Sequence, residues 1–489
     1  MGSSSSKRPQ FVDPRHVCTS PDQVRSQFLK VLYRWDETRL DEFRALFLSR
    51  ASKDNASDPA YWPEETVIAF LVERNPDTEI AVRNAGPLLY KMMLHYGSFP
   101  FPVEEGKRMT CDIFLRSIYM MSRTALSVLW RDYGSIGGVP QTRQRRPVDD
   151  VRLLFQSMAS EKDEEDDAAR TEDDDEDLLD VLFFVMHRVQ EERSPKCSSK
   201  RESVKKAASA LPSSCSRNLG GTVERGDLRS MLELIIVLLN SRVLGTMAPP
   251  NKNVIGCMMN AFMPASSEHL GSEWETFRNV VLGSCPNLIA ILSAFIERSF
   301  QITNFFWLQA ETLPKSLNEF RGIVSQSNII SADQLSQLLL VIPVGLVLHF
   351  NNITYRGESV AEHASQIASH LQTPGRLLIG RCLDGASAHD PQIICAYTGF
   401  PDMYDGYLSS TVAPRSGSMV FSLTPTHEMY AAEKQEIQLN IGVKADPNEV
   451  SQDEQAGIME IPDGKCLLEV EIGSLSLERL IGAFELWTM

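Results

Sequence analysis

Apolar residues recur at helical spacing through the first part of the chain. In the segment that begins at Ser20, the residues Val24, Phe28 and Leu32 fall on one helix face, and the Ser-Pro-Asp sequence at its start is typical of a helix N-terminus. Four further helical patterns follow, separated by Pro, Gly and Asn. They read DEFRALFLSR, EETVIAFLVERN, AGPLLYKMMLHYG and TCDIFLRSIYMMSRTALSVLW. These patterns predict an all-helical lobe of five or more helices.

Two longer apolar runs are predicted to be core segments and not membrane spans. The run Leu228–Leu244 carries three charged residues and is typical of a buried amphipathic helix. The run Leu335–Phe350 has Pro343 in its middle and is shorter than the roughly 20 residues that a membrane span needs.

Two charged runs interrupt the helical part of the chain. Glu161–Asp177 holds twelve acidic residues and two basic ones, whereas Ser194–Gly221 is basic and rich in serine. We interpret both as solvated loops, although an acidic run can also bind a metal or a basic partner. The apolar stretch LLDVLFFVMHRVQ lies between them and predicts a helix packed on the lobe.

Short alternating or β-branched runs follow the helices, and Gly, Pro and Asp interrupt them. They read RLLIGRCL, QIICAYTGF, SMVFSLTP, EMYAAEK, IQLNIGV, KCLLEVEI and GAFELWTM, and one helix, GESVAEHASQIASHLQ, is expected before them. The predicted fold class is α+β, with an all-α helical lobe followed by a two-sheet β-sandwich with flanking helices. The predicted parts are a disordered tail at 1–20, a helical lobe at 21–312 with disordered charged insertions at about 158–177 and 194–225, a linker at 313–326 and a sandwich domain at 327–489.

Composition narrows the function classes. The net charge of −16 argues against general nucleic-acid binding, which needs a basic surface. The nine cysteines are scattered singly with no CxxC pair, which is typical of buried or unreactive thiols in a reducing compartment. No apolar segment of a secretory signal follows the start, so a cytoplasmic protein is expected.

The motifs of common enzymes are not found in the sequence. It contains no P-loop, no GxGxxG, no HExxH and no GxSxG motif. Cys382 and Cys395 fall on consecutive strand segments as candidate cross-strand neighbours, and we interpret them as buried thiols. The sequence predicts no catalytic residue, no cofactor and no metal site. Five histidines near the C-terminus have no zinc-site spacing and are predicted to be surface or capping residues: His349, His363, His370, His389 and His427.

The order of the C-terminal segments resembles a TLDc domain. The strings that carry the resemblance are ITYRGESVAEHASQI, PGRLLIGRC, IICAYTGFP, SMVFSLTPTHEMYAA and LEVEIGSLSLERLIGAFELWTM. The residues that match the family pattern are Tyr355, Gly357, Ser359, Leu377, Leu378, Ile379, Ala396, Tyr397, Phe421, Leu423, Pro425, Tyr430, Phe484, Glu485, Leu486 and Trp487. Upstream, EWETFRNVVLGSCPNLIAILSAF is similar to a helical segment of the fungal proteins named for restriction of telomere capping.

The resemblance has two departures. The Gly-rich segment and the acidic strand of the family are not recognisable between Glu433 and Pro462, and Cys395 replaces the usual glycine of the third strand. The resemblance therefore implies a divergent TLDc domain at 327–489, shortened in its middle.

The resemblance implies a regulatory protein and not an enzyme. TLDc proteins include oxidation-resistance proteins and regulators that bind the vacuolar proton pump, the V-ATPase, and promote its disassembly. The leading hypothesis is a non-catalytic V-ATPase regulator at the vacuole membrane, with stress or telomere-capping roles implied by the family name. Two alternatives stay open: a helical interaction adaptor whose TLDc remnant is only structural, and a thiol-dependent oxidative-stress enzyme that uses Cys382, Cys395 or Cys466.

The first residues, MGSSSSKRP, match the N-myristoylation pattern M-G-x-x-x-[ST], with Gly2 as the acceptor. One acyl chain gives only marginal membrane binding, and Lys7 and Arg8 add a small electrostatic attraction. The stretch therefore predicts a reversible tether that needs a protein partner for stable attachment.

Overall fold

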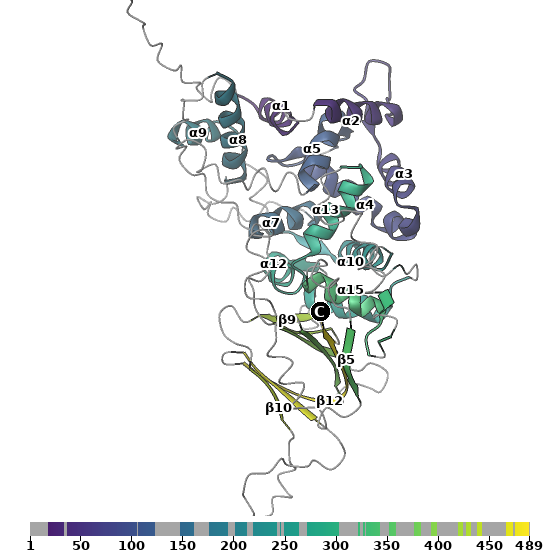
Figure 1. Ribbon diagram of the computed structural model, residues 1–489. Coiled ribbons are helices and arrows are strands. Elements are labelled where there is room, and N and C mark those ends of the chain that lie inside the picture. Colours follow the sequence, from purple (N-terminus) through teal and green to yellow (C-terminus); the bar gives the residue numbers. More distant parts are fainter. Residues whose placement is uncertain are drawn as a thin grey trace, which may run out of the picture. The chain divides into compact units, whose positions relative to one another are not determined.

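The computed structural model confirms the predicted α+β class, with helices before residue 342 and a large sheet after it (Figure 1). The chain forms two compact units. Unit 1 comprises Met1–Ser230, Gly271–Trp274 and Ile289–Phe305, and unit 2 comprises Met231–Leu270, Glu275–Leu288 and Phe306–Met489. The structure describes residues 18–33, 37–104, 106–122, 147–160, 176–193, 201–212, 219–241, 245, 249–263, 271–302, 321–322, 326–327, 329–342, 352–357, 376–382, 393–398, 419–423, 427–431, 438–442, 466–472 and 475–488.

Unit 1 is mainly helical, and each of the five helical patterns of the first part corresponds to one of its helices. Its elements are α1 (Pro21–Leu32), α2 (Glu37–Arg50), β1 (Tyr61–Trp62), α3 (Glu64–Arg74), the 3-10 helix η2 (Pro76–Thr78), α4 (Glu79–Ser98), β2 (Met109–Thr110), α5 (Cys111–Met121), α7 (Pro147–Met158), α8 (Glu176–Arg193), α9 (Arg201–Ala208), β3 (Thr222–Glu224), β4 (Gly271–Glu273) and most of α13 (Leu288–Ser299). The helix α10 (Arg225–Leu239) begins in this unit and continues into unit 2.

Local sequence signals explain where α1 begins. Ser20 is its N-cap, and the Ser20 hydroxyl accepts a hydrogen bond from the Gln23 N–H over 3.3 Å. The helix α4 departs from the prediction, since it begins at Glu79 and continues through Pro87. Proline in a helix interior removes one backbone bond, and the burial of residues such as Leu88 and Met92 along α4 offsets that loss.

An aromatic cluster forms the centre of unit 1. The rings of Phe47 and Trp62 stack with centroids 5.7 Å apart, and Trp62 also lies 4.7 Å from Phe114. The Trp62 indole N–H donates to the Phe47 carbonyl over 2.8 Å. All three side chains are fully buried. The cluster joins α2, α5 and the small sheet in which β1 pairs with β2.

The predicted helix between the charged runs is present as α8. It packs on α1, where the rings of Phe28 and Phe184 meet edge to face at 6.0 Å. The prediction of a disordered insertion at 194–225 is wrong at α9 and β3, because Val204 and Val223 are fully buried. Burial of these apolar side chains stabilises order in a stretch whose charge favours solvation.

Unit 2 combines helices with a sheet. Its helices are the remainder of α10, α11 (Lys252–Phe262), most of α12 (Trp274–Gly283) and α15 (Ala332–Val341), and its strands are β5 (Asn352–Gly357), β6 (Arg376–Cys382), β7 (Ile393–Thr398), β8 (Met419–Ser422), β9 (Glu428–Ala431), β10 (Gln438–Gly442), β11 (Cys466–Ile472) and β12 (Leu475–Thr488). Both apolar runs that were candidates for membrane spans contain buried helices, α10 and α15. Unit 2 therefore includes helices that precede the predicted linker at 313–326.

The eight strands form one antiparallel hydrogen-bonded network in the order β10-β11-β12-β6-β7-β8-β9, and β5 also pairs with β12. The first half of β12 pairs with β11 up to Ile481, and the second half pairs with β5 and β6. A register shift between Ile481 and Ala483 separates the two halves. The predicted strands are all present. The strand β5 and the first half of β12 are not among the predicted strands. The helix expected at GESVAEHASQIASHLQ lies outside the described residues.

Within the part of the chain that the structure describes, no single helix is long and apolar enough to cross a membrane. The helices α12 and α13 meet that length and hydropathy only when they are taken together as a bent pair.

Candidate functional site

The sheet brings most of the TLDc-like segments into adjacent strands. In the register, Leu486 of β12 lies between Tyr355 of β5 and Leu378 of β6. Leu378 in turn lies opposite Ala396 of β7. The next pairs are Trp487 with Leu377, Leu377 with Tyr397, Glu485 with Ile379, Phe484 with Gly357, Cys395 with Phe421 and Val420 with Tyr430. Gly2, Ser359 and Pro425 lie outside the described residues.

Leu423, just after β8, and His427, just before β9, contact three helical segments of unit 2. We call this place the His427 junction, made of Cys257, Ser284, Gln337, Leu423 and His427. The Gln337 side chain on α15 donates to the Leu423 carbonyl over 3.2 Å. The His427 backbone N–H donates to the Cys257 carbonyl of α11 over 3.2 Å. The His427 ring Nε2 lies 2.8 Å from the Ser284 carbonyl, just after α12. The junction therefore joins helices and sheet within one unit.

His427 corrects the prediction of surface or capping histidines. Its side chain is fully buried, and burial lowers the pKa of His427 to about 4, although the Ser284 carbonyl favours the charged ring. Sequence reasoning missed this role because the residues that bury it lie far away in the chain. The other four histidines of that prediction lie outside the described residues: His349, His363, His370 and His389.

Cys18, Cys111 and Cys395 have the properties of buried or protonated thiols. Cys395 is fully buried, as predicted. It pairs with Ile379 in the sheet, so Cys382 is not its direct cross-strand neighbour. Burial raises the pKa of Cys18 and Cys111 to about 11. Thiols with such values are protonated at neutral pH and react slowly.

A second group of thiols lies at the His427 junction. Cys257 and Cys285 are both buried, and burial raises the pKa of the Cys285 thiol. In the sheet, Cys382 of β6 and Cys466 of β11 both pair with Ile481 of β12 from opposite sides. Among the described residues no group of three or more His, Cys, Asp and Glu residues could hold a metal ion.

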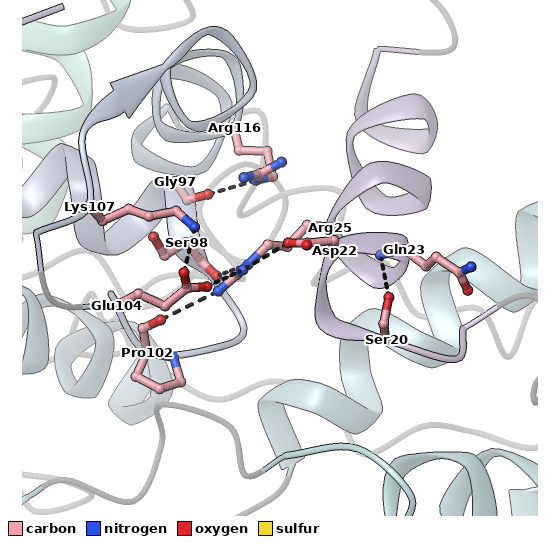
Figure 2. A network of polar contacts seen from close by, with 10 residues as sticks. All are labelled: Ser20, Asp22, Gln23, Arg25, Gly97, Ser98, Pro102, Glu104, Lys107 and Arg116. Carbon is pink, nitrogen blue, oxygen red and sulfur yellow. Dashed lines mark hydrogen bonds and ion pairs between the residues drawn. The ribbon is translucent and has the colours of Figure 1, made fainter. Parts of the chain in front are cut away.

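Unit 1 contains a polar network around Arg25 (Figure 2). The Arg25 Nε donates to the Ser98 carbonyl over 3.1 Å, and its Nη2 donates to the Pro102 carbonyl over 3.4 Å. Its Nη1 lies 3.3 Å from a Glu104 carboxylate oxygen. Hydrogen bonds from Lys107 and from Arg25 hold the pKa of Glu104 below its usual range. Arg25 falls on the same helix face as the buried apolar residues of α1, and that position was the sequence signal for its burial.

Arg116 completes this network. Its Nε donates to the Gly97 carbonyl over 2.6 Å (Figure 2), and burial lowers the pKa of Arg116 to about 10, so it stays charged at neutral pH. Gly97 and Ser98 are the last two residues of α4, where carbonyl groups have no partner within the helix and the dipole favours cations. Arg25 and Arg116 therefore cap α4, and the network stabilises the fold.

A second charged cluster joins α4, α7 and α8. The Arg152 Nη2 lies 3.0 Å from an Asp177 oxygen and 3.5 Å from an Asp149 oxygen, and both aspartates are fully buried. Burial lowers the pKa of His95 on α4 to about 4 and outweighs the attraction of Asp177. A buried pair of this kind costs about 3–5 kcal/mol to break by removing one partner. The cluster is thus a structural connection between three helices.

Comparison with known proteins yields no relative for this chain. No family model matches it, and neither a curated protein nor a solved structure matches it.

Proposed function

We propose that the chain is a non-catalytic TLDc-type regulatory protein that binds the V-ATPase and promotes its disassembly at the vacuole membrane. In this proposal the β-rich part docks on the pump, and a myristoyl group on Gly2 provides a reversible tether. The observation that carries the proposal is the pairing of the TLDc-like segments around β12. A short connection in the sheet supports the two-layer arrangement that such a domain needs.

The connection from β9 to β10 is too short for a flat sheet. These strands lie at opposite ends of the strand order, six steps apart, and at about 4.8 Å a step a flat sheet would separate them by about 29 Å. Only residues 432–437 join them, and the seven Cα–Cα steps from Ala431 to Gln438 span at most about 25 Å. The strand path must therefore curl, which supports a β-sandwich.

The long strand β12 offers the place for that curl. Its register shift falls at Gly482, between the half that pairs with β11 and the half that pairs with β5 and β6. A bulge bends a strand and increases its twist, and glycine accommodates such bends. We infer two layers that share β12, one with β10 and β11 and the other with the remaining strands.

The burial of Cys395, one of the three cysteines of the thiol-enzyme alternative, argues against a catalytic thiol at that position. A catalytic cysteine needs a lowered pKa and some exposure. Cys18, Cys111 and Cys285 have raised pKa values instead, and Cys395 is fully buried.

Cross-linking of the full-length protein to purified V-ATPase, followed by mass spectrometry, tests the docking proposal. Lysine cross-links to pump subunits should come from Lys434, Lys444 and Lys465 in the β-rich part. Cross-links only from unit 1 lysines such as Lys53 and Lys107 would support the helical-adaptor alternative and contradict the proposal. A binding measurement alone would not separate the two.

A separate experiment tests the tether. The intact mass of the protein from its native host should show loss of Met1 and addition of one myristoyl group on Gly2. Gly2→Ala should reduce membrane association while leaving direct binding to detergent-solubilised pump unchanged. An unmodified N-terminus in the native protein would refute the tether without affecting the docking proposal.

A further inference from the structure

The proton on the His427 ring can be assigned from its contacts. The Ser284 carbonyl can only accept, so Nε2, at 2.8 Å from it, carries the hydrogen. The other ring nitrogen, Nδ1, is buried and has no hydrogen-bond partner among the described residues. It is therefore the unprotonated nitrogen, and the ring is neutral.

A second proton on this ring would find no hydrogen-bond acceptor among the described residues. It would place an N–H donor at Nδ1 and a full charge on a fully buried side chain, and a buried charge without a counter-ion is costly. Among the described residues, the buried thiols of Cys257 and Cys285 lie next to the contact points, and burial raises the pKa of the Cys285 thiol, so this group carries no charge that would offset a charged ring. The charged residues on the packed helices α11, α12 and α15 lie at their solvent-facing positions or first turns: Lys252, Glu275, Arg278 and Asp333.

We propose that His427 is an acid-operated latch between the sheet and the helices of unit 2. In its neutral form His427 holds the start of β9 against the Ser284 and Cys257 carbonyls. Protonation expels the ring into water and releases the start of β9. This inference is independent of whether the chain binds a proton pump.

The position of His427 makes the release local. It immediately precedes β9, which pairs only with β8 among the described strands. Leu423, at the other end of the connection, keeps its own bonds to Ile393 and to Gln337. Opening of the latch therefore frees β9 on its helix side while β8 stays in the sheet.

Hydrogen exchange of the full-length protein at pH 7.5 and 5.5 tests the latch. A released histidine has an ordinary pKa of about 6.5, whereas the buried ring has a pKa of about 4. The ratio of the open to the closed form should therefore rise about tenfold between pH 7.5 and pH 5.5. After correction for intrinsic exchange rates, protection of the His427 amide should fall about tenfold. Protection of the Asn287 amide, which donates to Leu340 over 3.0 Å, should not change.

The matched variant is His427→Gln, because a glutamine amide can donate to the Ser284 carbonyl but does not titrate. Its protection at residue 427 should be equal at both pH values. An equal fall in the variant, or no fall in the wild type, would overturn the proposal. If the variant does not fold, an NMR titration of the wild-type His427 ring decides the question: a midpoint near 6.5 with the fold unchanged contradicts the latch.

Discussion

Gly97 of α4 packs directly against Ile113 of α5, and Gly97→Ala is the sharpest test of how unit 1 is packed. A Cβ at this position would lie 2.4 Å from the Ile113 carbonyl oxygen and 2.6 Å from the Ile113 Cγ2. The backbone oxygen cannot rotate away, so the two helices must separate by about 1 Å. Ile113 and Phe114 on α5 are buried, so that movement would disturb a close-packed core.

The expected loss combines three contributions. Overpacking of a filled core costs about 1–3 kcal/mol. Moving Gly97 also disturbs the bond from Arg116 to its carbonyl, and a bond to a charged group contributes about 1.5–3 kcal/mol. Replacing a helical glycine by alanine, in contrast, stabilises the helix by about 0.5–1 kcal/mol. If the displacement removes about half of the contribution of the Arg116 hydrogen bond, the free energy of unfolding decreases by about 2–3 kcal/mol in total.

Urea unfolding measured by circular dichroism checks this value, with two matched variants in the same unit. At Gly86 the new Cβ meets only the side chain of Ile68, at 2.5 Å, which can change rotamer. At Gly226 it meets nothing within 4 Å. Gly97→Ala should therefore be the least stable and Gly226→Ala at least as stable as the wild type. A Gly97→Ala protein as stable as the wild type, or more stable than Gly86→Ala, would refute the reasoning.

Other features lead to four further predictions. Ser331→Ala should lower the free energy of unfolding of unit 2 by about 1 kcal/mol in urea unfolding, because it removes the N-cap hydroxyl of α15. Trp62→Phe should cost unit 1 about 2 kcal/mol in the same assay, since it leaves the buried Phe47 carbonyl without its donor. Cys111, with a pKa of about 11, should react with a maleimide at pH 7.5 about a hundredfold more slowly than a free cysteine, and an equal rate would contradict its desolvation. The buried His427 ring has a pKa of about 4, below the ordinary 6.5, so the unfolded chain takes up a proton at a higher pH than the folded chain does. The free energy of unfolding should therefore be highest above pH 6.5 and about 2 kcal/mol lower at pH 5. His427→Gln should abolish this loss.

The helices of unit 1 are predictable because their signals are local. In α1, a capping serine, a proline in the first turn and apolar residues on one face all lie within thirteen residues. The strands of the sheet are likewise predicted by short β-branched runs. The strand β5 and the first half of β12 have weaker patterns, and their pairing with distant partners decides their structure.

The His427 junction could not be predicted from local sequence. His427 is buried by residues such as Ser284, which lies 143 positions earlier in the chain. Polar groups at Leu423 and Asn287 are likewise bonded to α15, at Gln337 and Leu340. Histidine is intermediate in its tendency to be buried and serine is mostly exposed, so burial at such positions follows from the tertiary fold and not from periodicity.

The two ends of the charged stretch between α7 and β3 meet at a single point. The Ser160 N–H donates to the Thr222 carbonyl over 2.9 Å, and a Cβ on Gly221 would lie 2.1 Å from the Ser160 oxygen, so only glycine fits there. A segment whose ends are joined in this way can change in length at little cost, because loop-closure entropy grows slowly with length. The acidic run beyond Ser160 can thus be lengthened or shortened, or can accept an inserted reporter domain, while the hydrogen bond between Ser160 and Thr222 keeps the end of α7 next to β3.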